Sequence, residues 1–234
     1  MDVLVAAAIH DAKNALNALG VWLEEAQREC ASQPASPALA RAKTIASTLS
    51  GQLVELLALY RAGDGSLRLA VEDQYLEDFL ADLMAELAES RAIVTQTQDA
   101  PEGGAAIAID TDFTAAGEIG AWAFDAYLVK FVLLDALRNA LRHAKQRVCF
   151  TLALEPGGGI RFSITDDGDG YPDAILRSGN QASTEMTAAS SGLGLSFAHL
   201  IAARHATPAG LHGRLELAND GLGKSGARFS LILP

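Results

Sequence analysis

The chain has 234 residues, of which 50% are hydrophobic and 20% are charged, a composition typical of a folded globular protein. This length is sufficient for two domains, one of them small. Eighteen basic and 29 acidic side chains give a formal net charge of −11, which disfavours binding to nucleic acid or to an anionic membrane surface. Cys30 and Cys149 lack metal-ligand spacing and are expected to be free thiols.

The N-terminal apolar stretch, residues 1–9, is too short for an export signal or a membrane span. Charged residues, Asp11 and Lys13, follow it directly. Together with the free thiols, this predicts a cytoplasmic protein that is not attached to a membrane.

Two helices are predicted in the first quarter of the chain. Apolar residues recur in alternating steps of three and four from Ile9 to Cys30, and again from Leu39 to Tyr60. Two prolines, Pro34 and Pro37, separate the two patterns, so residues 1–62 are expected to form a helical hairpin. A single hairpin leaves its apolar faces partly uncovered. We therefore expect a homodimer with a four-helix bundle; packing against the rest of the chain is the alternative.

A linker is predicted at residues 63–66, Gly-Asp-Gly-Ser, and residues 63–234 are expected to form the second domain. Periodicity in this domain predicts three helices, over 75–90, 125–144 and 192–205. It predicts strands over 66–72, 93–98, 147–154, 160–165, 211–218 and 227–233. This order predicts an α+β fold, a two-layer sandwich with helices on one face of a mixed sheet.

Three short segments of the second domain carry the residues of chemical interest. Asn139-Ala140-Leu141-Arg142-His143-Ala144 ends a predicted helix, Asp166-Asp167-Gly168-Asp169-Gly170 follows a strand, and Gly192-Leu193-Gly194-Leu195 opens another helix. Each segment alone is also compatible with an ordinary turn or a polar helix surface. In this order, and joined to these elements, they resemble the GHKL-type nucleotide-binding domain shared by histidine kinases, gyrase and MutL. The resemblance covers residues 67–234.

The resemblance implies ATP and Mg²⁺ as ligands. In this family the asparagine at the position of Asn139 contacts the metal, and Asp135, one turn earlier on the same helix face, can hold a metal-bound water. Arg142, His143 and Lys145 offer positive charge near the phosphates. A solvated polar stripe is the alternative for Arg142 and Lys145.

The adenine base is expected at the second segment. The resemblance implies that Asp166 accepts a hydrogen bond from the exocyclic amine of adenine. Gly168 and Gly170 leave room for the flat base, whereas Asp167 and Asp169 are expected to be solvated turn residues.

The third segment is expected to bind phosphate. Gly192 and Gly194, together with Leu193 and Leu195, lie at a helix N-terminus, where glycines expose N–H groups to anions. The family usually has a further glycine at the position of Ser190. The residues before this segment are rich in Ser, Thr, Ala and Gly, a composition expected of a mobile lid, and lack the paired phenylalanines of many sensor kinases.

A phosphoryl acceptor is expected near the start of the chain. The segment His10-Asp11-Ala12-Lys13-Asn14 resembles the phosphoacceptor box of histidine kinases. His10 follows the apolar position Ile9 and should face solvent, and Asp11 can fix its tautomer and accept its proton. In the family, the residue at Asn14 orients the water that dephosphorylates the response regulator. An ordinary surface histidine is the alternative.

These features together imply a histidine kinase. It would pass the γ-phosphoryl group of ATP to His10 and then to an aspartate in the receiver domain of a response regulator. Only nine residues precede His10, so no sensory domain is expected and a separate sensory or regulatory protein would supply the signal. One alternative is a histidine phosphotransfer protein with a degenerate ATP domain. The other is a non-enzymatic, ATP-gated module that binds a regulator.

Overall fold

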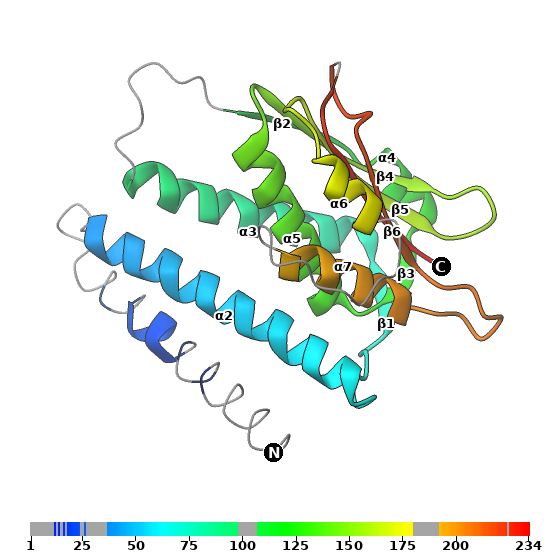
Figure 1. Cartoon of the computed structure of the whole chain (residues 1–234), viewed down its shortest axis with the longest axis horizontal. Helices are drawn as coiled ribbons and strands as arrows, with labels where there is room; N and C mark the ends of the chain where they lie inside the picture. Colours follow the sequence, from blue (N-terminus) through cyan, green and yellow to red (C-terminus); the bar gives the residue numbers. More distant parts are fainter. Residues whose placement is uncertain are drawn as a thin grey trace. The chain divides into compact units, whose positions relative to one another are not determined.

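The computed structural model describes residues 12, 14, 16, 18–23, 26, 37–97, 107–179, 192–223 and 225–234. The chain divides into two compact units (Figure 1). One comprises Met1–Leu67 with Ala85–Gly104, and the other comprises Arg68–Met84 with Ala105–Pro234.

The first unit contains the long helix α2 (Pro37–Gly63), which confirms the second predicted helix and extends it at both ends. Pro37 is tolerated at the first helical position because its missing N–H has no partner there in any case. The helix ends in a turn in which Gly65 has φ 74° and the N–H of Ser66 donates to the carbonyl oxygen of Arg61 at 2.9 Å. The described residues between 12 and 26 are also helical.

The second unit is built on a five-stranded sheet with the order β2-β4-β5-β7-β6 (Figure 1). Its strands are β2 (Ala108–Asp112), β4 (Arg147–Leu154), β5 (Ile160–Asp166), β7 (Arg228–Leu233) and β6 (Arg214–Ala218). β2 pairs with β4 in parallel, and the remaining pairs are antiparallel, so the predicted mixed sheet is confirmed. A separate two-stranded sheet joins β1 (Glu72–Tyr75) to β3 (Ala121–Phe124).

Helices pack on one face of this sheet. α5 (Ala126–His143) contacts β4 and β5, while α7 (Gly192–Arg204) contacts β6 and β7. The strand residues directed to this side are buried aromatic and aliphatic side chains, among them Phe150, Phe162 and Leu231. The unit also includes the first turns of α3 (Leu76–Thr97), and two short helices, α4 (Thr114–Ile119) and α6 (Asp173–Gly179). This arrangement is the predicted two-layer α+β sandwich.

Two of the predicted strands are wrong. Residues 67–71 are irregular, and the strand of this region, β1, begins only at residue 72. Residues 93–97 are helical and continue α3, although their β-branched composition favours a strand. Local propensity is a weak determinant, and a helix that is already formed extends at little cost. The elements β2, α4 and β3 were not predicted, because each is short and shows no clear apolar period.

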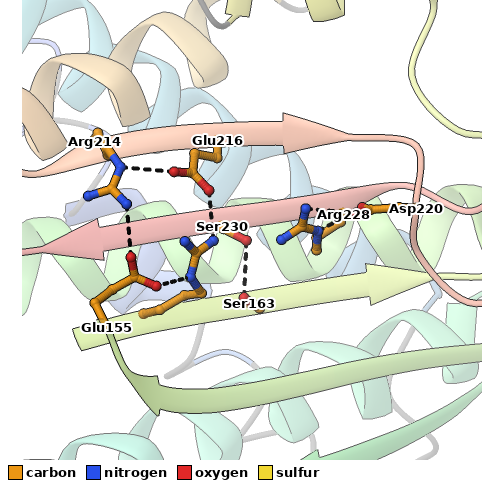
Figure 2. A network of polar contacts seen from close by, with 8 residues as sticks. Glu155, Ser163, Arg214, Glu216, Asp220, Arg228 and Ser230 are labelled. Carbon is orange, nitrogen blue, oxygen red and sulfur yellow. Dashed lines mark hydrogen bonds and ion pairs between the residues drawn. The ribbon is translucent and has the colours of Figure 1, made fainter. Parts of the chain in front are cut away.

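The opposite face of the sheet carries a network of charged side chains (Figure 2). Arg161 on β5 and Arg214 on β6 both bind Glu155 and Glu216, with N–O distances of 2.8 Å for three of the four contacts. The guanidinium groups lower the pKa of Glu155 through hydrogen bonds. A hydrogen bond of 3.0 Å joins the buried hydroxyls of Ser163 and Ser230 on the central strands. This face is therefore polar, which explains why one helical layer is enough.

A buried polar junction fixes the start of α5. The Asp125 carboxylate accepts the N–H of Leu128 at 3.0 Å, which caps the helix, and the N–H of Ala70 at 2.9 Å. The backbone N–H of Asp125 donates to Nε2 of His205 at 3.0 Å. The His205 ring is therefore neutral with its proton on Nδ1, which donates to the carbonyl oxygen of Ile201 at 2.8 Å.

This junction should make stability depend on pH. Burial lowers the pKa of His205 below its ordinary value of 6.5, so the unfolded state takes up a proton first as the pH falls. The contribution of His205 is then complete above about pH 6.5 and is lost as the pH decreases toward the folded-state pKa. We predict that the difference in free energy of unfolding between wild type and His205→Gln, measured with urea, shrinks between about pH 7.5 and about pH 5. A constant difference over that range would contradict the assignment of a buried neutral ring.

Candidate functional site

The two helices that carry the first and third segments run in opposite directions. The start of α5 is bonded to His205, which directly follows the end of α7. Farther along, the rings of Phe131 on α5 and Phe197 on α7 meet edge to face with centroids 5.4 Å apart. At 1.5 Å per residue, Asn139 lies about 21 Å and Gly194 about 16 Å from the junction along the helices. The pairing therefore brings both segments toward the same end of the domain.

The last two turns of α5 display the predicted metal and phosphate residues. Asn139 is half-buried, while Arg142 and His143 are exposed. Asp135, one turn before Asn139, is exposed. Partial desolvation of its carboxyl by the surrounding chain raises its pKa, and the charges of Arg138 and Arg142 only partly oppose this effect. An amide oxygen beside a carboxyl is a set of hard oxygen donors, which fits Mg²⁺ with its remaining waters.

The end of α5 and the acidic turn are in direct contact. A Cβ atom on Gly168 would lie 2.5 Å from the carbonyl oxygen of His143, so only glycine permits this approach. The Asp167 carboxylate accepts the N–H groups of residues 145, 146 and 147 at 2.8–3.2 Å, and these bonds lower its pKa. Asp167 is therefore a turn residue, as predicted, and it has a further role that the sequence did not indicate: it fixes the chain between α5 and β4.

Asp169 is exposed, but it forms an ion pair with Lys145. The hydrogen bond from the ammonium group raises the pKa of Lys145. The ammonium group of Lys145 is therefore paired with the turn rather than free to meet a phosphate.

Asp166 lies at the end of β5 and is 4% exposed. Its Oδ1 accepts the N–H of Gly168 at 2.8 Å and the N–H of Ala227 at 3.2 Å. Among the described residues, no donor contacts its Oδ2. One oxygen is therefore fixed by the backbone and the other remains available as an acceptor, which fits the exocyclic amine of adenine.

Gly226 allows the backbone before β7 to pack directly against the backbone of Asp166. A Cβ atom on Gly226 would lie 1.8 Å from the carbonyl oxygen of Asp166, a separation that requires the backbone to move. We predict that Gly226→Ala lowers the melting temperature by several degrees, corresponding to at least about 2 kcal/mol. Gly63→Ala is the control, since a Cβ atom there meets nothing within 4 Å. Equal melting temperatures for the two variants would contradict this close approach.

Two residues that no sequence motif marks, Tyr171 and Asn219, pair next to the acidic turn. The side chain of Asn219 accepts the N–H of Tyr171 at 2.7 Å and donates to its carbonyl oxygen at 2.9 Å. Gly170 allows the turn, with φ 80°. Burial, and secondarily the charge of Asp166, raise the pKa of Tyr171, so a neutral phenol lies near the proposed base site. An aromatic residue directly after the glycine turn was the only sequence signal, and nothing in the sequence connects it to Asn219.

The glycines of the third segment form the first turn of α7, which begins at Gly192. The first N–H groups of a helix have no partner within the helix, so Gly192, Leu193 and Gly194 present donors where an anionic phosphate is expected. Leu195 is half-buried in the next position. The predicted lid runs between Tyr171 and Ser191. Its first part is described and forms the short helix α6, whereas residues 180–191, including Ser190, lie outside the described residues. His10 and Asp11 also lie outside them, and Asn14 is helical and exposed.

Residues 124–234 match the family model of histidine kinase-, DNA gyrase B- and HSP90-like ATPases. This part of the chain is a GHKL-type ATP-binding domain. The described acidic turn, the end of α5 and the glycine turn of α7 all lie within the matched residues.

Solved histidine kinases share the fold of the chain. Full-length ShkA in complex with AMPPNP aligns over 100% of this chain with a TM-score of 0.64 and 20% identity. The Acinetobacter baumannii histidine kinase AdeS aligns over 92% of this chain and 94% of its own, with a TM-score of 0.57 and 16% identity. The nucleotide-free catalytic domain of ThkA aligns over 71% of this chain and 96% of its own, with a TM-score of 0.52 and 15% identity.

The chain spans 46% of the length of ShkA. No curated protein matches the sequence significantly. Within the described residues, no helix has the length and apolar character needed to cross a membrane.

Proposed function

We propose that this protein is a histidine kinase that transfers the γ-phosphoryl group of Mg·ATP to His10. The observation that carries the proposal is the state of Asp166. Its carboxylate is buried, one oxygen is bound by backbone N–H groups, and the other has no donor among the described residues. An acceptor that the backbone holds in place and that has an oxygen without a protein donor is suited to a ligand that donates to it, and the exocyclic amine of adenine does so.

The residues around Asp166 would each hold one part of the nucleotide. Asp166, Gly168 and Gly170 would bind the base. Asn139 would ligate Mg²⁺, and Asp135 would bind a water on the metal; bound Mg²⁺ neutralises charge on the β- and γ-phosphates. Positive charge from Arg142 and His143, and the first N–H groups of α7 at Gly192, Leu193, Gly194 and Leu195, would hold the phosphates.

His10, Asp11 and Asn14 would form the acceptor site. One imidazole nitrogen of His10 would attack the γ-phosphorus, the bond to the ADP oxygen would break, and Asp11 would take the proton from the other nitrogen. The phosphoryl group would then pass to an aspartate of a response-regulator receiver domain. Asn14, which is exposed on a helix, would position the water for the reverse, dephosphorylating reaction.

We also propose that residues 1–62 form the predicted helical hairpin, with residues 63–234 as the catalytic domain, and that two copies join through the hairpin. Three large apolar side chains of α2 are 43–60% exposed in the single chain: Ile45, Leu49 and Leu56. Spacings of four and seven residues place them on one helix face. A second hairpin packed on this face would complete a four-helix bundle.

The test is incubation of the full chain with γ-labelled ATP and Mg²⁺. The proposal predicts a label that is stable in base, labile in acid, and absent from His10→Ala. Label acquired only from a phosphorylated receiver domain would instead identify a phosphotransfer protein. Nucleotide binding without any transfer would identify an ATP-gated binding module.

A further inference from the structure

The junction of Ala70, Asp125 and His205 lies at the far end of α5 and α7 from the proposed nucleotide site. It combines four hydrogen bonds of 2.8–3.0 Å, and its two side chains are buried, Asp125 at 5% and His205 at 3% exposure. None of its members touches Asp166 or the acidic turn through a described hydrogen bond. Any effect of the junction on the nucleotide must therefore pass through α5 and α7 rather than through direct contact.

The junction fixes α5 and α7 to each other at one point. Nε2 of His205 accepts the backbone N–H of Asp125, the cap residue of α5, and Nδ1 donates to the carbonyl oxygen of Ile201 in the last turn of α7. A single imidazole therefore links the two helix ends. The backbone of His205 is fixed as well, because its carbonyl oxygen accepts the N–H of Gly213 at 2.8 Å just before β6. Any sliding or rotation of one helix along the other breaks at least one of these bonds.

Asn139 and the glycine turn are at the opposite ends of the same two helices. Because helices are stiff over this length, a displacement of α5 relative to α7 at the junction also displaces the metal-binding and phosphate-binding residues at the other end. Asp166 is anchored differently, by β5 and by the N–H groups of Gly168 and Ala227. A change at the junction should therefore affect the phosphates and spare the base.

We propose that Asp125 and His205 are positioning residues that set the spacing between the metal-binding end of α5 and the phosphate-binding start of α7. The inference rests on the proposed nucleotide site and deepens it. The Asp125 carboxylate also accepts the N–H of Ala70, in the segment that follows α2 and begins the second unit. Asp125 thus links that segment to the nucleotide helices.

The test compares two ligands that use different parts of the site. Mg·AMPPNP requires base, metal and phosphate contacts, whereas adenosine requires the base contacts alone. Affinities of the full chain for both are measured by calorimetry or NMR titration. Four variants are compared with wild type: His205→Leu, His205→Gln, Asp125→Ser and Ser230→Ala.

Each variant isolates one contact. His205→Leu removes the link, and it should weaken Mg·AMPPNP binding by at least about tenfold while adenosine affinity stays within about twofold. His205→Gln keeps an acceptor for the Asp125 N–H and should restore most of the lost affinity. Asp125→Ser keeps a helix cap but releases Ala70, and should weaken Mg·AMPPNP binding selectively as well. Ser230→Ala removes a buried hydrogen bond on the other face of the sheet and should change neither affinity.

Equal losses for both ligands in His205→Leu would overturn the inference, because a merely structural role weakens the whole domain. Unchanged Mg·AMPPNP affinity would overturn it too. If His205→Leu does not fold, Asp125→Ser decides by the same two criteria. A wild-type chain that binds adenosine and Mg·AMPPNP equally weakly would instead refute the proposed function, and the inference with it.

Discussion

Replacing Asn139 with alanine should reduce phosphorylation of His10 from Mg·ATP by at least about a hundredfold. The amide oxygen of Asn139 would be the protein's own ligand to Mg²⁺, and alanine at this position supplies no donor. Asn139 is only half-buried and lies within the last turns of α5. Because alanine favours helix, Asn139→Ala should leave the fold intact. The measurement is the initial rate of acid-labile labelling from γ-labelled ATP.

Asn139→Asp provides the matched control, since it keeps an oxygen at the same position and should retain measurable labelling. Adenosine should bind Asn139→Ala as it binds wild type, because the base site at Asp166 is unchanged. Labelling of Asn139→Ala at a rate within about threefold of wild type would rule out the metal role.

Replacing Asp166 with asparagine should weaken ATP binding by about tenfold to a hundredfold without unfolding the domain. The asparagine Oδ1 can still accept the N–H groups of Gly168 and Ala227, which stabilise the turn. Its amide nitrogen then replaces the available Oδ2 and faces the adenine amine with a second donor. Two donors that face each other in a buried site cannot both be satisfied.

Calorimetric titration with Mg·AMPPNP would measure this loss, and thermal unfolding would show whether the fold is retained. The control is Asp169→Asn, which removes a charge from the exposed part of the same turn. It should leave the affinity within about twofold of wild type. Tight binding by Asp166→Asn would show that the base does not depend on this carboxylate.

The main elements of the ATP-binding domain were predictable because their apolar patterns are long and regular. α5 follows its 3.6-residue period over five turns and begins at a side-chain cap, Asp125. β4 and β5 are separated by an unambiguous glycine turn. By contrast, β2 is a short edge strand with exposed Asp110 and Asp112, so it has no apolar alternation for sequence analysis to detect.

The residues of the site were predictable where they belong to a local sequence motif. Asn139, Asp166 and the glycines lie in recognisable segments, and the structure brings the first two segments into contact. The hydrogen-bonding roles of Asp167, Tyr171 and Asn219 were missed because they arise from pairings between distant parts of the chain. The same holds for Asp125 and His205, 80 residues apart. Tertiary hydrogen bonds of this kind leave no periodic signal.

Titration of the full chain with Mg·AMPPNP tests the central claim most directly, namely that α5, the acidic turn and the start of α7 together form one nucleotide site. The account predicts saturable binding of one nucleotide per chain, with weaker binding in both Asn139→Ala and Asp166→Asn. The absence of saturable binding up to millimolar nucleotide, or binding that neither substitution weakens, would contradict it.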